Sequence, residues 1–179
     1  MKVVIAEKPS VARDIAKHLG ATTRGEGFLE GNGWTVTWAF GHLIELQEPE
    51  DHTPEWKPWR LSALPLIPDP FQLRPRADGS ANDQLARIKT FFETAEEIIC
   101  ATDAGREGEL IFRYILSWTG CEAKPVKRLW ISSLTDDAIK KGFAELKPAA
   151  DYESLYHAAR CRSEADWIAG MNATRLFPV

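Results

Sequence analysis

The sequence predicts an α/β fold in which a central, mostly parallel sheet is flanked by helices, because short apolar strands alternate with amphipathic helical segments. Two segments carry this prediction. Residues 1–6 form an apolar run that ends in Glu7 and Lys8, and residues 98–102 form another that ends in Asp103. A helical pattern follows each of them. The order of strand, acidic residue and helix therefore occurs twice, which is typical of parallel α/β sheets.

The amino-terminal third contains two further elements. A first helix is predicted from Pro9 to Gly20, because proline suits the first turn of a helix and glycine is a common C-terminal stop. Apolar residues recur with helical spacing between them. A hairpin is predicted over residues 25–40, where the Asn32-Gly33 pair lies between two β-prone runs.

Residues 47–80 are predicted to form a long irregular insertion, because they contain seven of the eleven prolines. Regular elements resume after it. In order, we expect a helix capped by Ser80 or Asn82 and ending at Phe92, a strand from Ile98, a helix from Glu107 to Gly120, a strand over Val126–Ile131, a helix over Thr135–Leu146, and a helix over Ser154–Ile168.

Composition limits the class of protein. A chain of 179 residues with 44% hydrophobic and 27% charged residues suits one soluble domain with part of a second. No apolar run is long enough for a membrane span and no signal peptide precedes the first strand, so a cytoplasmic protein without a membrane partner is expected. The three cysteines form neither a zinc pattern nor a disulfide framework. A net charge of −4 predicts that the chain alone holds DNA weakly.

The two strand ends predict a metal site. Neighbouring strands lie about 4.8 Å apart, and ligands of open α/β sheets bind at the carboxyl ends of strands. If the two strands are neighbours, Glu7, Lys8, Asp103 and Glu107 converge. Carboxylates held close together repel unless a proton or a divalent cation lies between them, so we expect Mg²⁺ there. Glu7 could then act as a general acid or base, and Lys8 could hold a phosphate.

Each of these residues also has a purely structural interpretation. Glu107 and Glu109 could simply stabilise a helix start, although Gly105 and Gly108 would weaken one that was only structural. His42 could contact phosphate or cap a strand. The pair Trp59-Arg60 could stack on single-stranded nucleic acid or hold the proline-rich loop in place. Arg160 and Arg162 precede Glu164 and Asp166 by four residues and could only brace their helix. Tyr114 lies in an apolar helical run and is expected in the core, and no convincing nucleophile is present.

Four segments carry a resemblance to a known family. They are Val4–Ser10 (VIAEKPS), Trp38–Leu43 (WAFGHL), Ala101–Glu109 (ATDAGREGE) and His157–Arg175 (HAARCRSEADWIAGMNATR). In this order they resemble type IA DNA topoisomerases, specifically the amino-terminal part of the bacterial topoisomerase III group. The resemblance implies a Toprim-type, Rossmann-like domain over residues 1–148 and the truncated start of the following helical domain over residues 149–179.

The resemblance also implies an activity and roles for individual residues. Such enzymes change DNA topology by cleaving one strand through a transient phosphotyrosine and passing another strand through the gap. Glu7, Lys8 and Arg106 would be the catalytic residues, with Arg106 orienting phosphate. Glu7, Asp103 and Glu107 would hold Mg²⁺. Single-stranded DNA would follow His42, Trp59, Arg60, Arg160, Arg162, Asp166, Asn172, Thr174 and Arg175.

Two departures from the family pattern limit this expectation. The acidic motif of the family often has the form Asp-x-Asp-x-Glu, but Gly105 occupies the middle position here, so a single Mg²⁺ is expected. The tyrosine nucleophile belongs to a later domain that this chain lacks. We therefore expect an inactive part of a nucleoid-associated enzyme, whose partners are DNA and the missing downstream domains. A stand-alone Toprim nuclease that uses metal-activated water is the main alternative, and a non-catalytic nucleic-acid-binding module is another.

Overall fold

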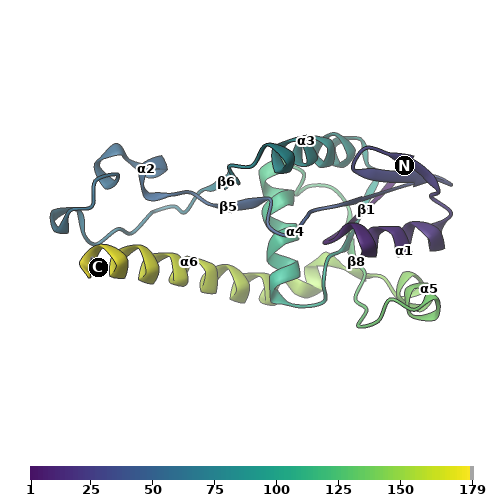
Figure 1. Cartoon of the computed structure of the whole chain (residues 1–179). Helices are drawn as coiled ribbons and strands as arrows, with labels where there is room; N and C mark the ends of the chain where they lie inside the picture. The colour runs from purple at the N-terminus through teal and green to yellow at the C-terminus, as the bar shows by residue number, and fades with distance from the viewer. Residues whose placement is uncertain (178–179) are drawn as a thin grey trace.

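A computed structural model describes residues 1–177, and a seven-stranded sheet forms its centre (Figure 1). The strand order is β2-β3-β4-β1-β7-β8-β9. The strands are β1 (Lys2–Ala6), β2 (Thr23–Gly25), β3 (Phe28–Gly31), β4 (Trp34–Trp38), β7 (Glu97–Ala101), β8 (Val126–Arg128) and β9 (Lys147–Pro148). The four central strands, β4-β1-β7-β8, run parallel, whereas β2, β3 and β9 pair antiparallel at the edges. The predicted α/β fold class is confirmed.

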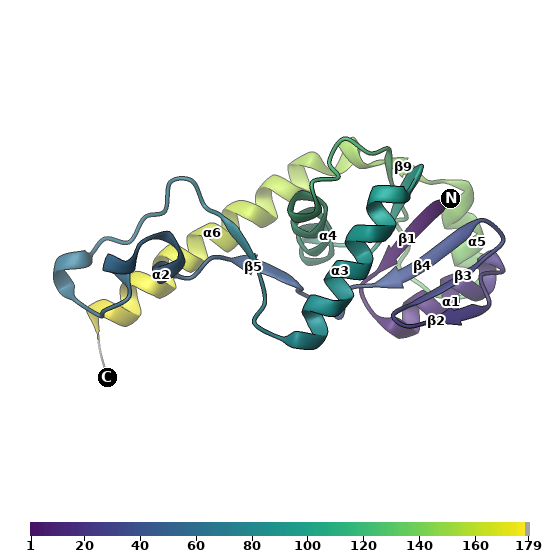
Figure 2. The same cartoon turned by 90° about the horizontal axis from the view of Figure 1, so that it is seen from above.

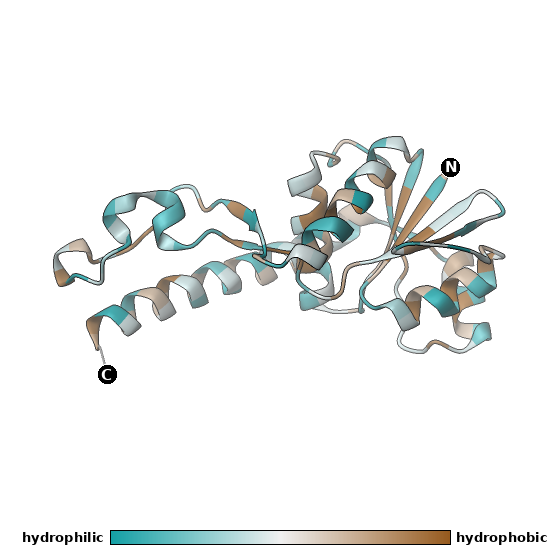
Figure 3. Cartoon of the chain, turned by 45° about the horizontal axis from the view of Figure 1, so that its top comes forward, coloured by the Kyte–Doolittle hydropathy of each residue, from teal (hydrophilic) through white to brown (hydrophobic). Residues whose placement is uncertain are grey.

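Helices cover both faces of this sheet. Helices α3 (Gly79–Thr94) and α4 (Arg106–Thr119) pack on one face, where Val3 and Ile5 of β1 belong to their core cluster. Helices α1 (Pro9–Leu19) and α5 (Asp136–Ala144) pack on the other face, with Val4 and Ala6. Side chains alternate between faces along a strand, so β1, fully buried at these positions, supplies both cores. In Figure 3 the central strands carry hydrophobic (brown) stretches, in keeping with helices on both faces of the sheet.

The structure has the turn and the helix end that the local sequence predicted, but some elements begin or end at other residues than expected. Asn32 and Gly33 both have positive φ (52° and 78°) and join β3 to β4 as a two-residue hairpin. Gly20 ends α1 in the left-handed conformation (φ 73°). The cap of α3 was predicted wrongly, because the side chain of Asp78, rather than Ser80 or Asn82, accepts the Ser80 N–H. Strands β2 and β9 were not predicted, and β8 ends at Arg128, short of Ile131.

The proline-rich insertion lies along the last helix, α6 (Glu153–Leu176), and the two form an extension from the main body (Figures 1 and 2). The insertion is largely irregular, as predicted. It begins directly after β5 (Ile44–Leu46), which pairs with β6 (Leu73–Pro75) in a two-stranded sheet, and it contains the short helix α2 (Pro49–His52) and 3₁₀ turns at Pro54–Trp56 and Leu61–Ala63. A third 3₁₀ turn, Ala149–Tyr152, precedes α6. The predicted helix end at Ile168 was wrong, because α6 continues through Gly170 to Leu176.

Polar side chains of α6 hold the insertion in place. Asn172 accepts the Leu66 N–H (2.7 Å) through Oδ1 and donates to the Leu66 carbonyl (2.9 Å) through Nδ2. Trp167 Nε1 donates to the Gln47 carbonyl at 3.0 Å. The carboxyl half of α6 therefore gains partners that its own sequence does not reveal. The domain boundary at residue 148 stays a prediction. Strands β5 and β6 pack on α4 of the main body, whereas Gln47 and Leu66, which lie between these strands in the sequence, contact α6.

Candidate metal and nucleic-acid site

Strands β1 and β7 are direct parallel neighbours, with Ala6 paired to Ala101. The residues that follow them, Glu7 and Asp103, therefore emerge at the same edge of the sheet. The Glu7 carboxylate accepts the Asp103 N–H at 3.3 Å. The condition on which the predicted convergence depended, adjacency of the two strands, is met.

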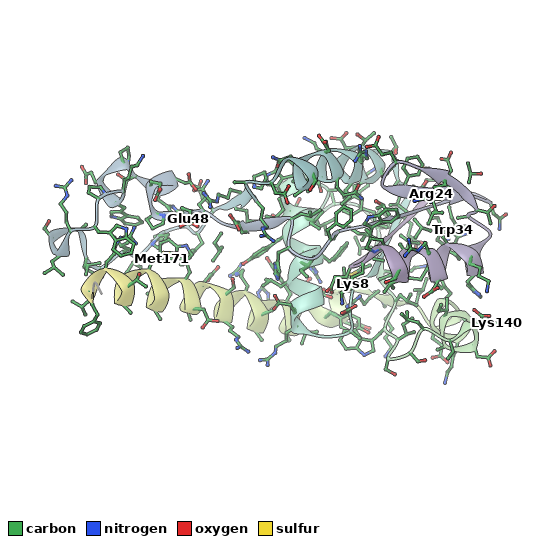
Figure 4. All side chains as sticks on the ribbon, viewed as in Figure 1. Lys8, Arg24, Trp34, Glu48, Lys140 and Met171 are labelled. Carbon is green, nitrogen blue, oxygen red and sulfur yellow. The ribbon has the colours of Figure 1, made fainter. Side chains whose placement is uncertain are left out.

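Lys8 lies between the two carboxylates. Its Nζ is 3.3 Å from Asp103 Oδ2 and 3.7 Å from Glu7 Oε1. Figure 4 shows Lys8 in the middle of the molecule, beside α4 and the start of α1. The hydrogen bond to Asp103, together with the negative charges of Asp103 and Glu7, raises the pKa of Lys8 above its ordinary value. The ammonium group of Lys8 thus interacts with both carboxylates, those of Glu7 and Asp103.

Glu107 lies apart from this group. It is the second residue of α4, its side chain is 73% exposed, and its carboxylate contacts His42 Nε2. His42 comes from the loop after β4. Over residues 1–177, no three acidic, histidine or cysteine side chains gather as a metal-ligand cluster. The structure thus brings together Glu7, Lys8 and Asp103 of the predicted set and leaves Glu107 with His42.

The two glycines of the acidic turn have different surroundings. A Cβ on Gly108 would lie 2.1 Å from the Asp103 carbonyl oxygen, and the Gly108 carbonyl accepts the Thr102 hydroxyl at 2.7 Å. Gly108 is therefore needed for the close approach of α4 to the turn. Gly105 has an extended backbone (φ 170°) and open space around the position of a Cβ. The absence of a carboxylate at Gly105 is thus not imposed by space or by backbone conformation.

Arg128 of β8 binds the backbone of the acidic turn. This role was not predicted from the sequence. Its side chain is 1% exposed and donates to the carbonyls of Thr102 (2.7 Å) and Asp103 (2.8 Å). It also pairs with the buried Glu109 at 3.1 Å. An arginine within an otherwise β-prone segment was the available signal, since buried arginines are rare unless paired.

Glu109 extends this network to α6. Arg113, one turn further along α4, lies 2.9 Å from Glu109 and 2.5 Å from Glu153. Arg113 also donates to the Ala149 carbonyl at 2.8 Å. A chain of alternating charges therefore connects the acidic turn with the first turn of the last helix. Glu109 thus has a structural role, but as a buried partner of two arginines rather than as the charge at a helix start that the sequence suggested.

Three residues of the predicted nucleic-acid set and Arg106, predicted as a catalytic residue, gather next to the acidic turn. His42, Arg106, Arg162 and Asp166 line a hollow of about 220 Å³ together with Glu107. Arg162 also pairs with Asp166 at 3.6 Å. Arg106 is exposed at the start of α4, and within residues 1–177 it forms no ion pair. The hollow is thus charged and is lined by both α4 and α6.

The remaining residues of that set lie at other positions of α6 and in the insertion. Arg160 pairs with Glu164 at 3.4 Å and lines a separate hollow under β6. Trp59 is 64% exposed, and the buried Arg175 places its guanidinium 5.5 Å from the Trp59 ring while donating to the Trp56 carbonyl. Asn172 binds the Leu66 backbone, as described above. Arg60 and Thr174 are exposed, and the Thr174 hydroxyl donates to the Gly170 carbonyl.

The fold and the acidic turn define a class of domain. Residues 2–134 match the model of the Toprim domain family, and the chain belongs to that family. Its sequence is 50% identical over 173 residues to DNA topoisomerase 3 of Bacillus licheniformis and 49% identical to that of Bacillus subtilis, in each case covering 97% of this chain and 24% of the relative. The chain thus spans about a quarter of the length of these relatives. The resemblance predicted from the four segments is confirmed.

A solved structure supports the same fold. Full-length topoisomerase I from Thermotoga maritima matches with a TM-score of 0.62 over 93% of this chain and 24% of that one, at 19% identity. At that identity the match concerns the fold alone.

None of the described helices has both the length and the apolar character needed to cross a membrane.

Proposed function

We propose that this chain is the metal-holding part of a type IA topoisomerase, an enzyme that changes DNA topology by transient single-strand cleavage. The observation that carries the proposal is the meeting of Glu7, Lys8 and Asp103 at the adjacent ends of β1 and β7. It is supported by the half-identical sequences of the relatives named DNA topoisomerase 3. A nucleoid location follows from a DNA substrate and belongs to the same proposal.

The proposed roles follow from charge and position. Lys8 holds the scissile phosphate as a point charge, and Glu7, 12% exposed and next to Lys8, moves a proton to or from the reacting oxygens. Arg106 adds an exposed positive charge at the start of α4. Single-stranded DNA follows the hollow of His42 and Arg162 and then α6 toward Trp59. The domain division at residue 148 and the binding roles of the other α6 residues belong to this proposal.

The donor set suits a divalent cation. Glu7 and Asp103 already share one positive charge, and Mg²⁺ is commonly held by one or two carboxylates with water and phosphate oxygens completing its shell. Glu107 would join them by turning away from His42. A metal ion held there supplies positive charge to the phosphate during cleavage and religation. We propose Mg²⁺ as the ion in the complete enzyme.

The tyrosines of this chain support a nucleophile located elsewhere in the protein. All three tyrosines lie within the described residues. Tyr114 is 3% exposed, Tyr152 stacks on Trp130, and Tyr156 lies under the Arg113 guanidinium. Burial raises the pKa of both Tyr114 and Tyr152, which makes their phenolates harder to form. We therefore propose that the isolated chain binds metal without cleaving DNA.

Replacing Asp103 with asparagine should weaken Mg²⁺ and Mn²⁺ binding by about tenfold or more, because it removes one of two shared negative charges at constant size. Calorimetric titration of the metal into the chain measures this directly. Asp83→Asn, an exposed change on α3, is the matched control and should bind as the unaltered chain does. Equal affinity of the Asp103 variant and the control would refute the proposed site.

Replacing Gly105 with aspartate should be tolerated and should tighten metal binding, on the order of tenfold, because an additional carboxylate enters open space at an extended backbone position. The unfolding temperature should then rise more steeply with added Mn²⁺ than it does for the unaltered chain. Gly105→Asn has the same size without the charge and should show no gain. A gain of equal size in both variants would point to shape rather than charge.

A further inference from the structure

Phe40, just after β4, has an unusual backbone and an unusual exposure. Its φ is +55°, a left-handed conformation that bulky residues rarely adopt, and its ring is 54% exposed. Glycine would satisfy this turn without strain. Neither burial nor backbone geometry therefore explains a phenylalanine here. Strained residues of this kind gather at functional sites, and the inference runs from the observed strain to a function.

Backbone hydrogen bonds fix Phe40 beside the acidic site. The Ala39 N–H donates to the Ala6 carbonyl at 3.0 Å, and the Gly41 N–H donates to the Glu7 carbonyl at 3.3 Å. The two residues that flank Phe40 are thus attached to the end of β1. The ring meets Trp38 edge-on, with 6.3 Å between ring centroids, and about half of the residue's surface faces solvent.

A hollow of about 280 Å³ opens next to this ring. Its lining includes His42, Leu43, Arg76, Asp78 and Ser80. Arg76 is exposed, and its N–H donates to the Leu43 carbonyl, which fixes the backbone at this point. The Asp78 carboxylate accepts the N–H and the hydroxyl of Ser80 at the start of α3, and these bonds lower its pKa. An aromatic face, an exposed cation and an acceptor therefore surround one space.

His42 lines both this hollow and the one that contains Arg106 and Arg162. A strand of nucleic acid that crosses His42 would therefore meet a cation on each side, with Glu7 and Lys8 close by. A base has a π-face that stacks on an aromatic ring, and its phosphate pairs with arginine.

We propose that Phe40 is a stacking platform for one base of single-stranded DNA beside the acidic site, with Arg76 holding the adjoining phosphate. The inference rests on the proposed function and adds a subsite to it. The left-handed turn holds the ring at the surface, where a base can cover it. On this proposal the strained phenylalanine is present because it binds DNA, not because it packs in the core.

The test is binding of a fluorescein-labelled oligothymidylate to the chain at low salt, followed by fluorescence anisotropy. Phe40→Leu removes the π-face and should weaken binding about five- to a hundredfold, whereas Phe40→Trp should retain it. Phe143→Leu makes the same change at a partly buried aromatic residue of α5, a helix that carries none of the proposed binding residues, and should have no effect. Arg76→Gln should weaken binding and flatten its dependence on salt.

A stability measurement separates stacking from a structural role. Phe40→Gly should keep or raise the unfolding temperature, because glycine relieves the left-handed turn, while binding falls as in Phe40→Leu. A fall in the unfolding temperature with unchanged DNA affinity would overturn the inference. Unchanged binding by all Phe40 variants, with binding lost in His42→Ala, would overturn it and leave the proposed function standing. No binding by the unaltered chain would contradict both.

Discussion

Replacing Arg128 with methionine should lower the free energy of unfolding by about 3–5 kcal/mol, the usual range when one partner of a buried ion pair is removed. The guanidinium is 1% exposed and neutralises Glu109, and it donates to the carbonyls of Thr102 and Asp103. Methionine fills part of the volume but leaves these acceptors in an apolar interior without their donor. Metal binding should weaken as well, because the backbone that carries Asp103 loses its support.

Chemical denaturation of the variant and the unaltered chain measures the loss. Arg87→Met is the matched control, because Arg87 pairs with Glu26, whose side chain is 85% exposed. An exposed pair contributes at most about 1 kcal/mol. If both variants lost the same small amount, Arg128 would not be the support of the acidic turn that its contacts indicate.

Replacing Gly108 with alanine should be nearly as damaging, although alanine ordinarily favours a helix. The added methyl group would lie 2.1 Å from the Asp103 carbonyl oxygen, which is backbone and cannot turn aside. Overpacking of this kind costs about 1–3 kcal/mol or more. The turn must move to relieve it, so Asp103 should lose its position near Glu7 and Lys8, and metal affinity should fall with stability.

Gly105→Ala provides the control within the same turn. Its Cβ enters open space at an extended backbone position, so both stability and metal affinity should stay close to those of the unaltered chain. Thermal unfolding and metal titration of the two alanine variants compare a crowded glycine with a free one. Equal behaviour of the two variants would show that the close approach of α4 to Asp103 is not required.

The strand ends were predictable because their signals are local. An apolar run followed by an acid and a helix start is visible at Glu7 and at Asp103 without knowledge of the partner strand. Adjacency of β1 and β7 had to be assumed, and the structure has it. The position of Glu107 was not predictable, because its partner His42 lies 65 residues away along the chain.

The ion-pair network of Arg128, Glu109 and Arg113 was not predictable either, because it joins residues from different segments of the chain. Arg128 and Glu109 belong to different elements, and only their packing reveals that both are buried. The length of α6 was also underestimated. Gly170 weakens a helix on its own, but the insertion packs beside it and Asn172 gains the Leu66 backbone as a partner. Tertiary contacts thus outweighed local propensity where the insertion meets the helix.

The most direct test of the account is to incubate the chain with end-labelled single-stranded DNA and Mg²⁺ or Mn²⁺, then to separate the products on a denaturing gel. The account predicts intact DNA and no covalent protein–DNA adduct, because Glu7, Lys8 and Asp103 can hold metal and phosphate but no exposed, activated tyrosine accompanies them. Free cleaved products that disappear with Asp103→Asn would contradict it. In that case the acidic site would activate water, and the chain would be a metal-dependent nuclease.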